Sequence, residues 1–180
     1  RDLDSSLVGS EMCIRDSLFA TAGAKLPDLP SPPPPVPVDM EGFLQTTAEV
    51  ARYRRSRLVD LEAFLQLAKQ ADTVLLDTRS RDAYDRKHLE GAVHLNFSDF
   101  TAEKLAAVVP DKETTVLIYC NNNLRGDADN FPVKHRVLAL NLPTFVNLYG
   151  YGYRHVYELN AYVSVDDPRL SLAGTAVEGG

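Results

Sequence analysis

The chain has 180 residues, of which 44% are hydrophobic and 24% are charged, an ordinary composition for a globular domain. Its net charge of −6 argues against nucleic acid as the main ligand, because binding to a phosphate backbone needs a surplus of cations. Two cysteines, Cys13 and Cys120, indicate no disulfide framework, and no cysteine–histidine cluster has zinc spacing. We therefore expect no metal or other cofactor. We also expect a monomer. No apolar run is long enough to span a membrane.

The first 40 residues are predicted to be a disordered N-terminus. Residues 18–24 resemble the end of a signal peptide, because Ala22 and Ala24 fit an Ala-x-Ala cleavage site. Residues 27–37 include four consecutive prolines, which is typical of a stiff spacer, with a ligand for an aromatic groove as the alternative. Because the chain begins with Arg1 rather than Met, we expect the sequence to be a fragment. The resemblance to a signal peptide predicts a periplasmic or secreted protein, with the cytoplasm as the alternative location.

From residue 41 to residue 163 the apolar pattern predicts helices that alternate with short strands. The expected helices are 41–55, 61–69 capped by Asp60, 80–84 capped by Ser80, a helix from 98 or 101 to 107, 132–141 and 144–149. The expected strands are 73–77, one within 88–95, 115–119, and a last strand that begins over 154–157. This alternation indicates a single α/β domain with a central parallel sheet flanked by helices. Residues 164–180 show no periodicity and are predicted to be a flexible tail.

The predicted strand over 115–119 ends at Cys120, which is where open α/β sheets bind their ligands. If residues 121–125 curl into a loop, their backbone N–H groups and Arg125 can stabilise a thiolate, which is the nucleophilic form of cysteine. The alternative is an inert core cysteine, the commoner role of a single buried thiol. Three consecutive asparagines after Cys120 favour a loop, because Asn tolerates turn conformations.

Several spaced motifs together resemble the rhodanese-like domain family over residues 58–163. They are Asp77-x-Arg79, Tyr84, His88-x-x-Gly91-Ala92, the loop after Cys120, and Leu148-x-x-x-Gly152-Tyr153-x-x-Val156-x-x-Leu159. The family consists of sulfurtransferases with an α/β fold around a parallel sheet. The resemblance implies that Cys120 takes a sulfane sulfur from a donor such as thiosulfate and carries it as a persulfide. It then passes the sulfur to cyanide, a thiol or another protein.

The resemblance also implies roles for the residues around the cysteine. The substrate-binding loop would comprise Asn121, Asn122, Asn123, Leu124 and Arg125, whose backbone amides would cradle the persulfide anion. The Arg125 side chain would either bind an anionic donor or hold the loop closed. Four further positions are mainly structural in the family: Asp77, Arg79, His88 and Gly91. Arg79 as an anion ligand is the alternative, and Gly91 is expected to supply a backbone conformation that other residues adopt only with strain.

Loop length separates the candidate activities. Cysteine-dependent phosphatases and arsenate reductases on this fold use Cys-x5-Arg, whereas Cys120 and Arg125 enclose only four residues. The shorter loop favours sulfur transfer over phosphatase or reductase chemistry. A non-catalytic rhodanese-fold module that binds a partner protein is the other alternative.

Two departures from the family pattern affect the predicted site. The usual loop glycine is replaced by Asn123, for which we expect a left-handed conformation. Residues 126–141 look like an insertion, and a helix that begins at Pro132 and breaks at Pro143 would displace the next helix N-terminus from Cys120.

The insertion also carries charges of both signs. Asp127 and Asp129 would raise the pKa of the Cys120 thiol by like-charge repulsion. The opposing cations on the same segment are Lys134, His135 and Arg136. A calcium loop is excluded, because the twelfth position counted from Asn121 is Pro132 rather than Glu.

Overall fold

The structure of the protein is a computed structural model, and it describes residues 37–178. The predicted signal peptide and almost all of the proline-rich spacer lie outside these residues. From Asp39 onward the described chain folds as one unit, wider than the predicted domain over 41–163. Within residues 37–178 no helix is long and apolar enough to cross a membrane.

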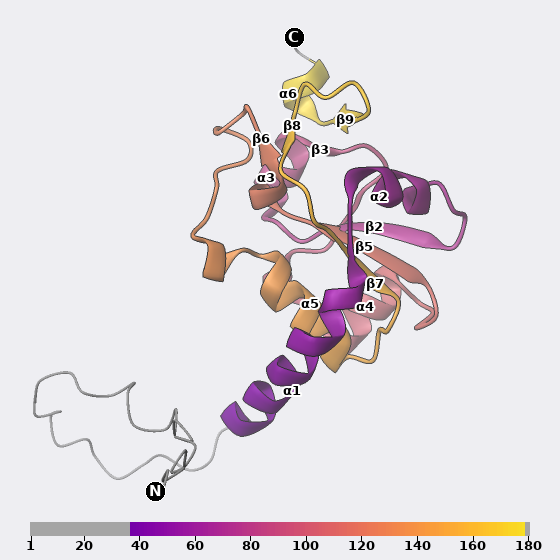
Figure 1. Cartoon of the computed structure of the whole chain (residues 1–180), viewed down its shortest axis with the longest axis vertical. Coiled ribbons are helices and arrows are strands. Elements are labelled where there is room, and N and C mark those ends of the chain that lie inside the picture. Colours follow the sequence, from indigo (N-terminus) through magenta and orange to yellow (C-terminus); the bar gives the residue numbers. More distant parts are fainter. Residues whose placement is uncertain (1–36, 179–180) are drawn as a thin grey trace, which may run out of the picture. The chain divides into compact units, whose positions relative to one another are not determined.

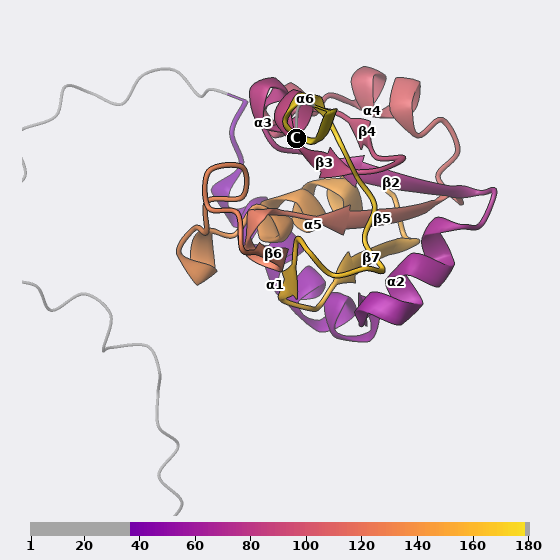
Figure 2. The ribbon, with the colours of Figure 1, turned by 90° about the horizontal axis from the view of Figure 1, so that it is seen from above.

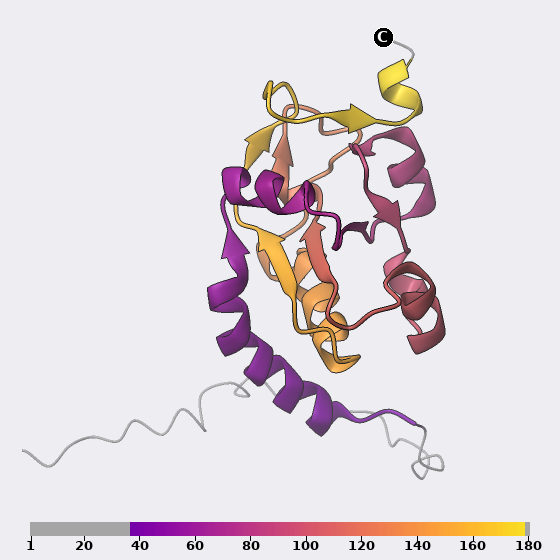
Figure 3. The ribbon, with the colours of Figure 1, turned by 90° about the vertical axis from the view of Figure 1, so that its right-hand side faces the viewer.

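The centre of the fold is a parallel sheet with the strand order β1-β7-β5-β2-β4 (Figures 1 and 3). Because β5 lies in the middle, its carboxyl end is surrounded by the loops that follow the neighbouring strands. The parallel arrangement confirms the predicted α/β class. The strands are β1 (Leu58–Val59), β2 (Thr73–Asp77), β4 (Val93–His94), β5 (Thr115–Tyr119) and β7 (Val156–Leu159).

Side chains alternate along β5, so the sheet contributes to a separate apolar core on each face. Val116 and Ile118 pack in the core that includes residues of α1, α4 and α5. Leu117 and Tyr119 pack in the other core, against α2 and Tyr84 of α3. Figure 1 shows α2 on one side of the strands and α4 and α5 on the other. The bounds of the helices are α1 (Met40–Tyr53), α2 (Leu61–Ala68), α3 (Arg81–Arg86), α4 (Ala102–Val108) and α5 (Asn141–Gly150).

Helix starts follow the capping residues that the sequence predicts. Asp60 accepts a hydrogen bond from Ala63 N at 2.8 Å, and Ser80 accepts one from Ala83 N at 3.4 Å. Thr101, rather than Ser98, caps α4 through Lys104 N. Each cap satisfies a helix N–H that would otherwise lack a partner, which fixes where the preceding loop ends.

Residues 164–178 do not form the predicted flexible tail. The strand β8 (Val163–Ser164) pairs with β6 (Leu124–Arg125), which directly follows the Cys120 loop. The strand β9 (Leu172–Ala173) pairs in antiparallel fashion with β3 (His88–Leu89), and the short helix α6 (Thr175–Glu178) follows it. These pairings are only two residues long, which is too short to produce a periodic pattern in the sequence.

The segment after β6 also differs from the prediction. Residues 126–140, here called the rim segment, form an irregular loop with one 3-10 turn, η4 (Arg136–Leu138), instead of a helix from Pro132. A single helix, α5, begins at Asn141 and runs through Pro143. Proline is tolerated there because the first turn of a helix needs no N–H donor.

Candidate active site

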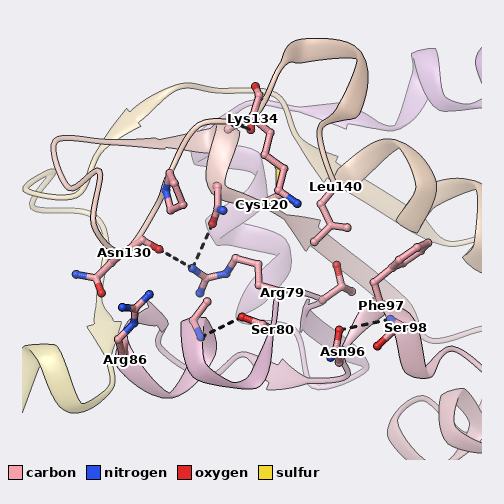
Figure 4. A pocket seen from close by; sticks show the side chains of 15 residues that line it. Arg79, Ser80, Arg86, Asn96, Phe97, Ser98, Cys120, Asn130, Lys134 and Leu140 are labelled. Carbon is pink, nitrogen blue, oxygen red and sulfur yellow. Dashed lines mark hydrogen bonds between the residues drawn. The ribbon is translucent and has the colours of Figure 1, made fainter.

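Cys120 lies directly after β5 and opens the 3-10 turn η3 (Asn121–Asn123). It is a free cysteine, 1% exposed, and lines a cavity of about 420 Å³. In Figure 4 the rim segment forms one wall of this cavity, and the residues that follow β2 and β4 form the facing wall. The polar and charged lining comprises Thr78, Arg79, Ser80, Arg86, Asn96, Ser98, Asn121, Asn122, Asn130 and Lys134.

Asn123 holds the turn in place. Its Oδ1 accepts hydrogen bonds from Cys120 N at 2.9 Å and from Asn141 Nδ2 at 2.9 Å. Its Nδ2 donates to the carbonyl oxygens of Leu159 and Ala161 at 2.7 and 3.1 Å. The predicted left-handed conformation is wrong, because among the described residues no residue other than glycine has a positive φ. A 3-10 turn with this side-chain brace needs no left-handed residue.

Three backbone N–H groups surround the sulfur of Cys120. They belong to Asn122, Asn141 and Leu140, and each of them lowers the pKa of the Cys120 thiol. Asn141 is the first residue of α5, and Leu140 is the residue before it. The rim segment therefore loops out and returns, and the N-terminus of α5 is not displaced from the cysteine as predicted. Such converging amides form a site for an anionic sulfur.

The thiol itself is not acidified. Burial raises the pKa of Cys120, the N–H groups of Asn122 and Asn141 lower it, Glu158 raises it further, and the net shift is upward. A loop N–H group, that of Asn122, does lower the thiol pKa, but burial outweighs it. Burial in low dielectric disfavours the charged form, and the backbone dipoles offset only part of that penalty.

Glu158 is the acidic group that acts on the thiol, and the sequence analysis did not find it. It lies on β7, is 5% exposed, and forms a bidentate ion pair with Arg54. Asn141 Nδ2 also donates to Glu158 Oε1 at 3.2 Å. A glutamate inside an otherwise apolar strand was the available signal, since a charge in that position needs a buried partner.

Neutralising Glu158 is expected to make Cys120 more reactive at neutral pH. In Glu158→Gln one cause of the raised thiol pKa is removed and Arg54 keeps its positive charge, so the thiol pKa falls. The rate of alkylation by iodoacetamide, measured against pH, should reach half its maximum at a lower pH than in the wild type. Glu113→Gln, at an exposed glutamate paired with His155, is the control and should leave the profile unchanged.

The two acidic residues of the insertion do not line the cavity. Asp127 pairs with Lys87 at 2.8 Å and accepts hydrogen bonds from Asn130. These contacts, led by the Lys87 hydrogen bond, lower the pKa of Asp127. Asp127 therefore fixes the rim segment against Lys87, which lies between α3 and β3. The carboxylate that raises the pKa of the Cys120 thiol is Glu158, not the predicted Asp127 and Asp129.

Asp77 and Arg79 form a buried ion pair at the end of β2, with a separation of 2.7 Å. The Tyr119 hydroxyl donates to Asp77 Oδ2 at 2.5 Å and accepts from Leu89 N. Every N–H group of the Arg79 side chain has an acceptor within the protein: Asp77, Lys87 O, Asn130 O and Asn121 Oδ1. This leaves Arg79 no free donor for an anion, which favours the structural reading over the ligand reading.

His88 and Gly91 lie behind this network. His88 stacks on Tyr84 with ring centroids 3.8 Å apart, and its Nδ1 lies 2.6 Å from Tyr84 O. Gly91 has a φ of +80°, the left-handed conformation that the sequence predicts. Neither residue lines the cavity, in agreement with the structural roles that the resemblance implies.

Arg125 is not brought together with Cys120. It is exposed on β6 and borders a different hollow, between the α2 start and the C-terminal segment. Leu124 is fully buried and also does not line the cavity beside Cys120. Of the predicted loop ligands, only Asn121 and Asn122 face it. The exposed cations at this cavity are Arg86 and Lys134.

Several lining residues were missed by sequence reasoning. Ser80, Asn96 and Ser98 follow β2 and β4, and the rule that parallel strands carry ligand sites at their carboxyl ends could have selected them. Lys134 and Leu140 come from the rim segment, which has no periodic pattern to place it. Within the described residues no group of three or more potential metal ligands is present.

Comparison with known proteins shows the family to which this fold belongs. The family model described as "Rhodanese-like domain" matches residues 60–161, more than half of the chain. The chain belongs to the rhodanese-like domain family. Its fold is similar to the BH2092 protein from Bacillus halodurans, at a TM-score of 0.50 and 16% identity, over 74% of this chain and 88% of that one.

Curated relatives at the sequence level are named thiosulfate sulfurtransferases. Thiosulfate sulfurtransferase GlpE from Coxiella burnetii is 36% identical over 64 residues, which is 36% of this chain and 56% of that protein. Thiosulfate sulfurtransferase PspE from Escherichia coli is 37% identical over 46 residues, 26% of this chain and 43% of that protein. The chain thus spans about half the length of the curated relatives it matches.

Proposed function

We propose that this protein is a sulfurtransferase that carries a sulfane sulfur as a persulfide on Cys120. The observation that carries the proposal is the position of this thiol in the wall of a cavity of about 420 Å³. Three backbone N–H groups that lower the thiol pKa support it. The outer sulfur of a persulfide would extend into that cavity. The names of the partial relatives support thiosulfate as one donor.

In the first half-reaction the thiolate of Cys120 attacks the outer sulfur of thiosulfate. A new S–S bond forms on Cys120, the sulfur–sulfur bond of thiosulfate breaks, and sulfite leaves with the electron pair. Arg86 and Lys134 lie at the cavity with exposed side chains and provide the positive charge that attracts this dianion. Because the thiol pKa is raised, this step should accelerate as the pH rises above neutral.

In the second half-reaction a nucleophile such as cyanide or a thiolate attacks the outer sulfur of the persulfide. The bond between the two sulfurs breaks, and its electron pair returns to the Cys120 sulfur as a thiolate. The amides of Asn122, Leu140 and Asn141 stabilise that leaving thiolate. The same three N–H groups also stabilise the thiolate of Cys120 before it attacks the donor in the first half-reaction.

A second candidate is a non-catalytic module that binds a partner protein. The observations that favour it are the 1% exposure of Cys120 and its raised pKa, since a buried neutral thiol is a poor nucleophile. This candidate predicts that Cys120 stays unmodified by sulfur donors and by iodoacetamide at neutral pH. We place it second because the thiol borders a cavity whose lining includes several polar and charged side chains. Export from the cytoplasm stays a proposal that rests on residues 18–24 alone.

Steady-state kinetics with thiosulfate and cyanide test the proposed activity. We expect thiocyanate formation with the parallel double-reciprocal lines of a two-step mechanism, because the two substrates react with different forms of Cys120. Cys120→Ser should lower the rate at least about 10³-fold, as removal of a catalytic nucleophile does. Thiocyanate formation that survives in Cys120→Ser would show that another group carries the sulfur.

A further inference from the structure

The rim segment presents an exposed surface of unusual composition beside the cavity. Residues 132–138 are all exposed, and this run contains no acidic residue. Val133, Val137 and Leu138 are 60, 70 and 67% exposed. We define the rim patch as Val133, Lys134, His135, Arg136, Val137 and Leu138.

The rim patch is tied directly to the catalytic loop. Asn122, two residues after Cys120, donates through Nδ2 to Lys134 O at 2.8 Å and accepts from Lys134 N at 3.0 Å. Lys134 also lines the cavity, and Figure 4 shows it on the same wall as Cys120. In Figure 2 the η4 turn projects from the domain on this side. A molecule seated on the rim patch would therefore touch the mouth of the cavity.

Exposed apolar side chains are normal when they are scattered, but their grouping with cations indicates an interaction surface. Three large apolar side chains within six residues are separated by Lys134, His135 and Arg136, while the chain as a whole carries a net charge of −6. An acidic macromolecule is repelled by most of such a protein and attracted at this patch. That charge pattern steers the partner toward the cavity mouth.

We propose that the rim patch docks an acidic protein that carries a reactive cysteine, and that this cysteine is the acceptor of the Cys120 sulfur. This inference rests on the proposed function and names its acceptor. The partner's thiolate attacks the outer sulfur of the Cys120 persulfide. A sulfur–sulfur bond forms on the partner cysteine, and the bond to Cys120 breaks with its electron pair going to the Cys120 sulfur. Any proton on the outer sulfur travels with it.

The test uses two defined peptides as acceptors. Each has one cysteine flanked by leucines, and one carries several glutamates where the other carries lysines. The protein is loaded with thiosulfate and desalted, and the gain of one sulfur on the peptide is followed by mass spectrometry. We expect transfer to the acidic peptide to be about tenfold faster or more than to the basic one at low salt, and the preference to shrink as salt is added.

Variants of the rim patch that do not line the cavity separate docking from chemistry. Arg136→Glu should reduce the preference for the acidic peptide, and Val137→Ser with Leu138→Ser should slow transfer to both peptides. Thiocyanate formation with cyanide should be unchanged in both, because these side chains are exposed and lie outside the cavity lining. Lys69→Glu makes the same charge change before the amino end of β2, whereas Cys120 lies at the carboxyl end of β5. This control should leave the preference intact.

The outcomes distinguish a failure of the proposed function from a failure of the docking inference. If the protein cannot be loaded by thiosulfate or an organic persulfide, the proposed function fails and this inference fails with it. If loading and thiocyanate formation are normal but both peptides react equally, or Arg136→Glu keeps the preference, only the docking inference is overturned. A dimer in sedimentation that Val137→Ser with Leu138→Ser dissociates would make a second copy the occupant and would also overturn it.

Discussion

Replacing Arg79 by methionine should lower the free energy of unfolding by about 3–5 kcal/mol, the usual effect of breaking a buried ion pair. Arg79 is 3% exposed and Asp77 is fully buried, so the variant leaves a carboxylate without its partner in the interior. It also removes donors from Lys87 O and Asn130 O, which lie in separate segments around the cavity. Chemical denaturation monitored by circular dichroism measures the change.

The matched control is Arg81→Met. Arg81 pairs with Asp85 at 3.3 Å, but both side chains are more than half exposed. Removal of such a pair should change the free energy of unfolding by no more than about 0.5 kcal/mol. If Arg79→Met were as mild as this control, the polar network at the end of β2 would not organise the site as described.

Replacing Phe131 by alanine should cost about 3–5 kcal/mol, as truncations of buried aromatic side chains do. Phe131 is 1% exposed, packs in the core with Leu117 and Leu124, and lies under the Arg79 guanidinium at 4.7 Å from the ring centre. It is the apolar anchor of the rim segment. Its loss should loosen the cavity wall. At a low temperature at which the variant is still folded, its KM for thiosulfate should therefore be higher than that of the wild type.

Thermal unfolding and steady-state kinetics measure the two effects of Phe131→Ala. Val137→Ala is the control, because Val137 lies on the same segment but is 70% exposed. It should leave both the melting temperature and the KM close to those of the wild type. A Phe131→Ala variant with wild-type stability would mean that the rim segment is held by its polar contacts alone.

The sheet and the position of the cysteine were predictable from sequence because both depend on local patterns. Buried strands such as 115–119 are continuous apolar runs, and the caps at Asp60 and Ser80 are single-residue signals. Cys120 could be placed at the carboxyl end of a central strand by the same reasoning. The functional reading then needed the spacing of Asp77, Arg79 and Cys120 taken together.

The features that could not be predicted depend on contacts between distant segments. The rim segment has no period, and it is positioned by Phe131 in the core and by the Lys87–Asp127 pair. The C-terminal residues are ordered by two-residue pairings with β6 and β3. The thiol pKa depends on burial and on Glu158 of the neighbouring strand β7, so the loop sequence alone could not predict its net direction.

The central claim is that Cys120 carries the transferred sulfur, and intact mass measures this most directly. The protein is incubated with thiosulfate, desalted and weighed with and without a reductant, alongside Cys120→Ser. The account predicts a gain of one sulfur atom in the wild type that the reductant removes and that Cys120→Ser lacks. No gain with thiosulfate, mercaptopyruvate or an organic persulfide would contradict it and would favour the non-catalytic binding module.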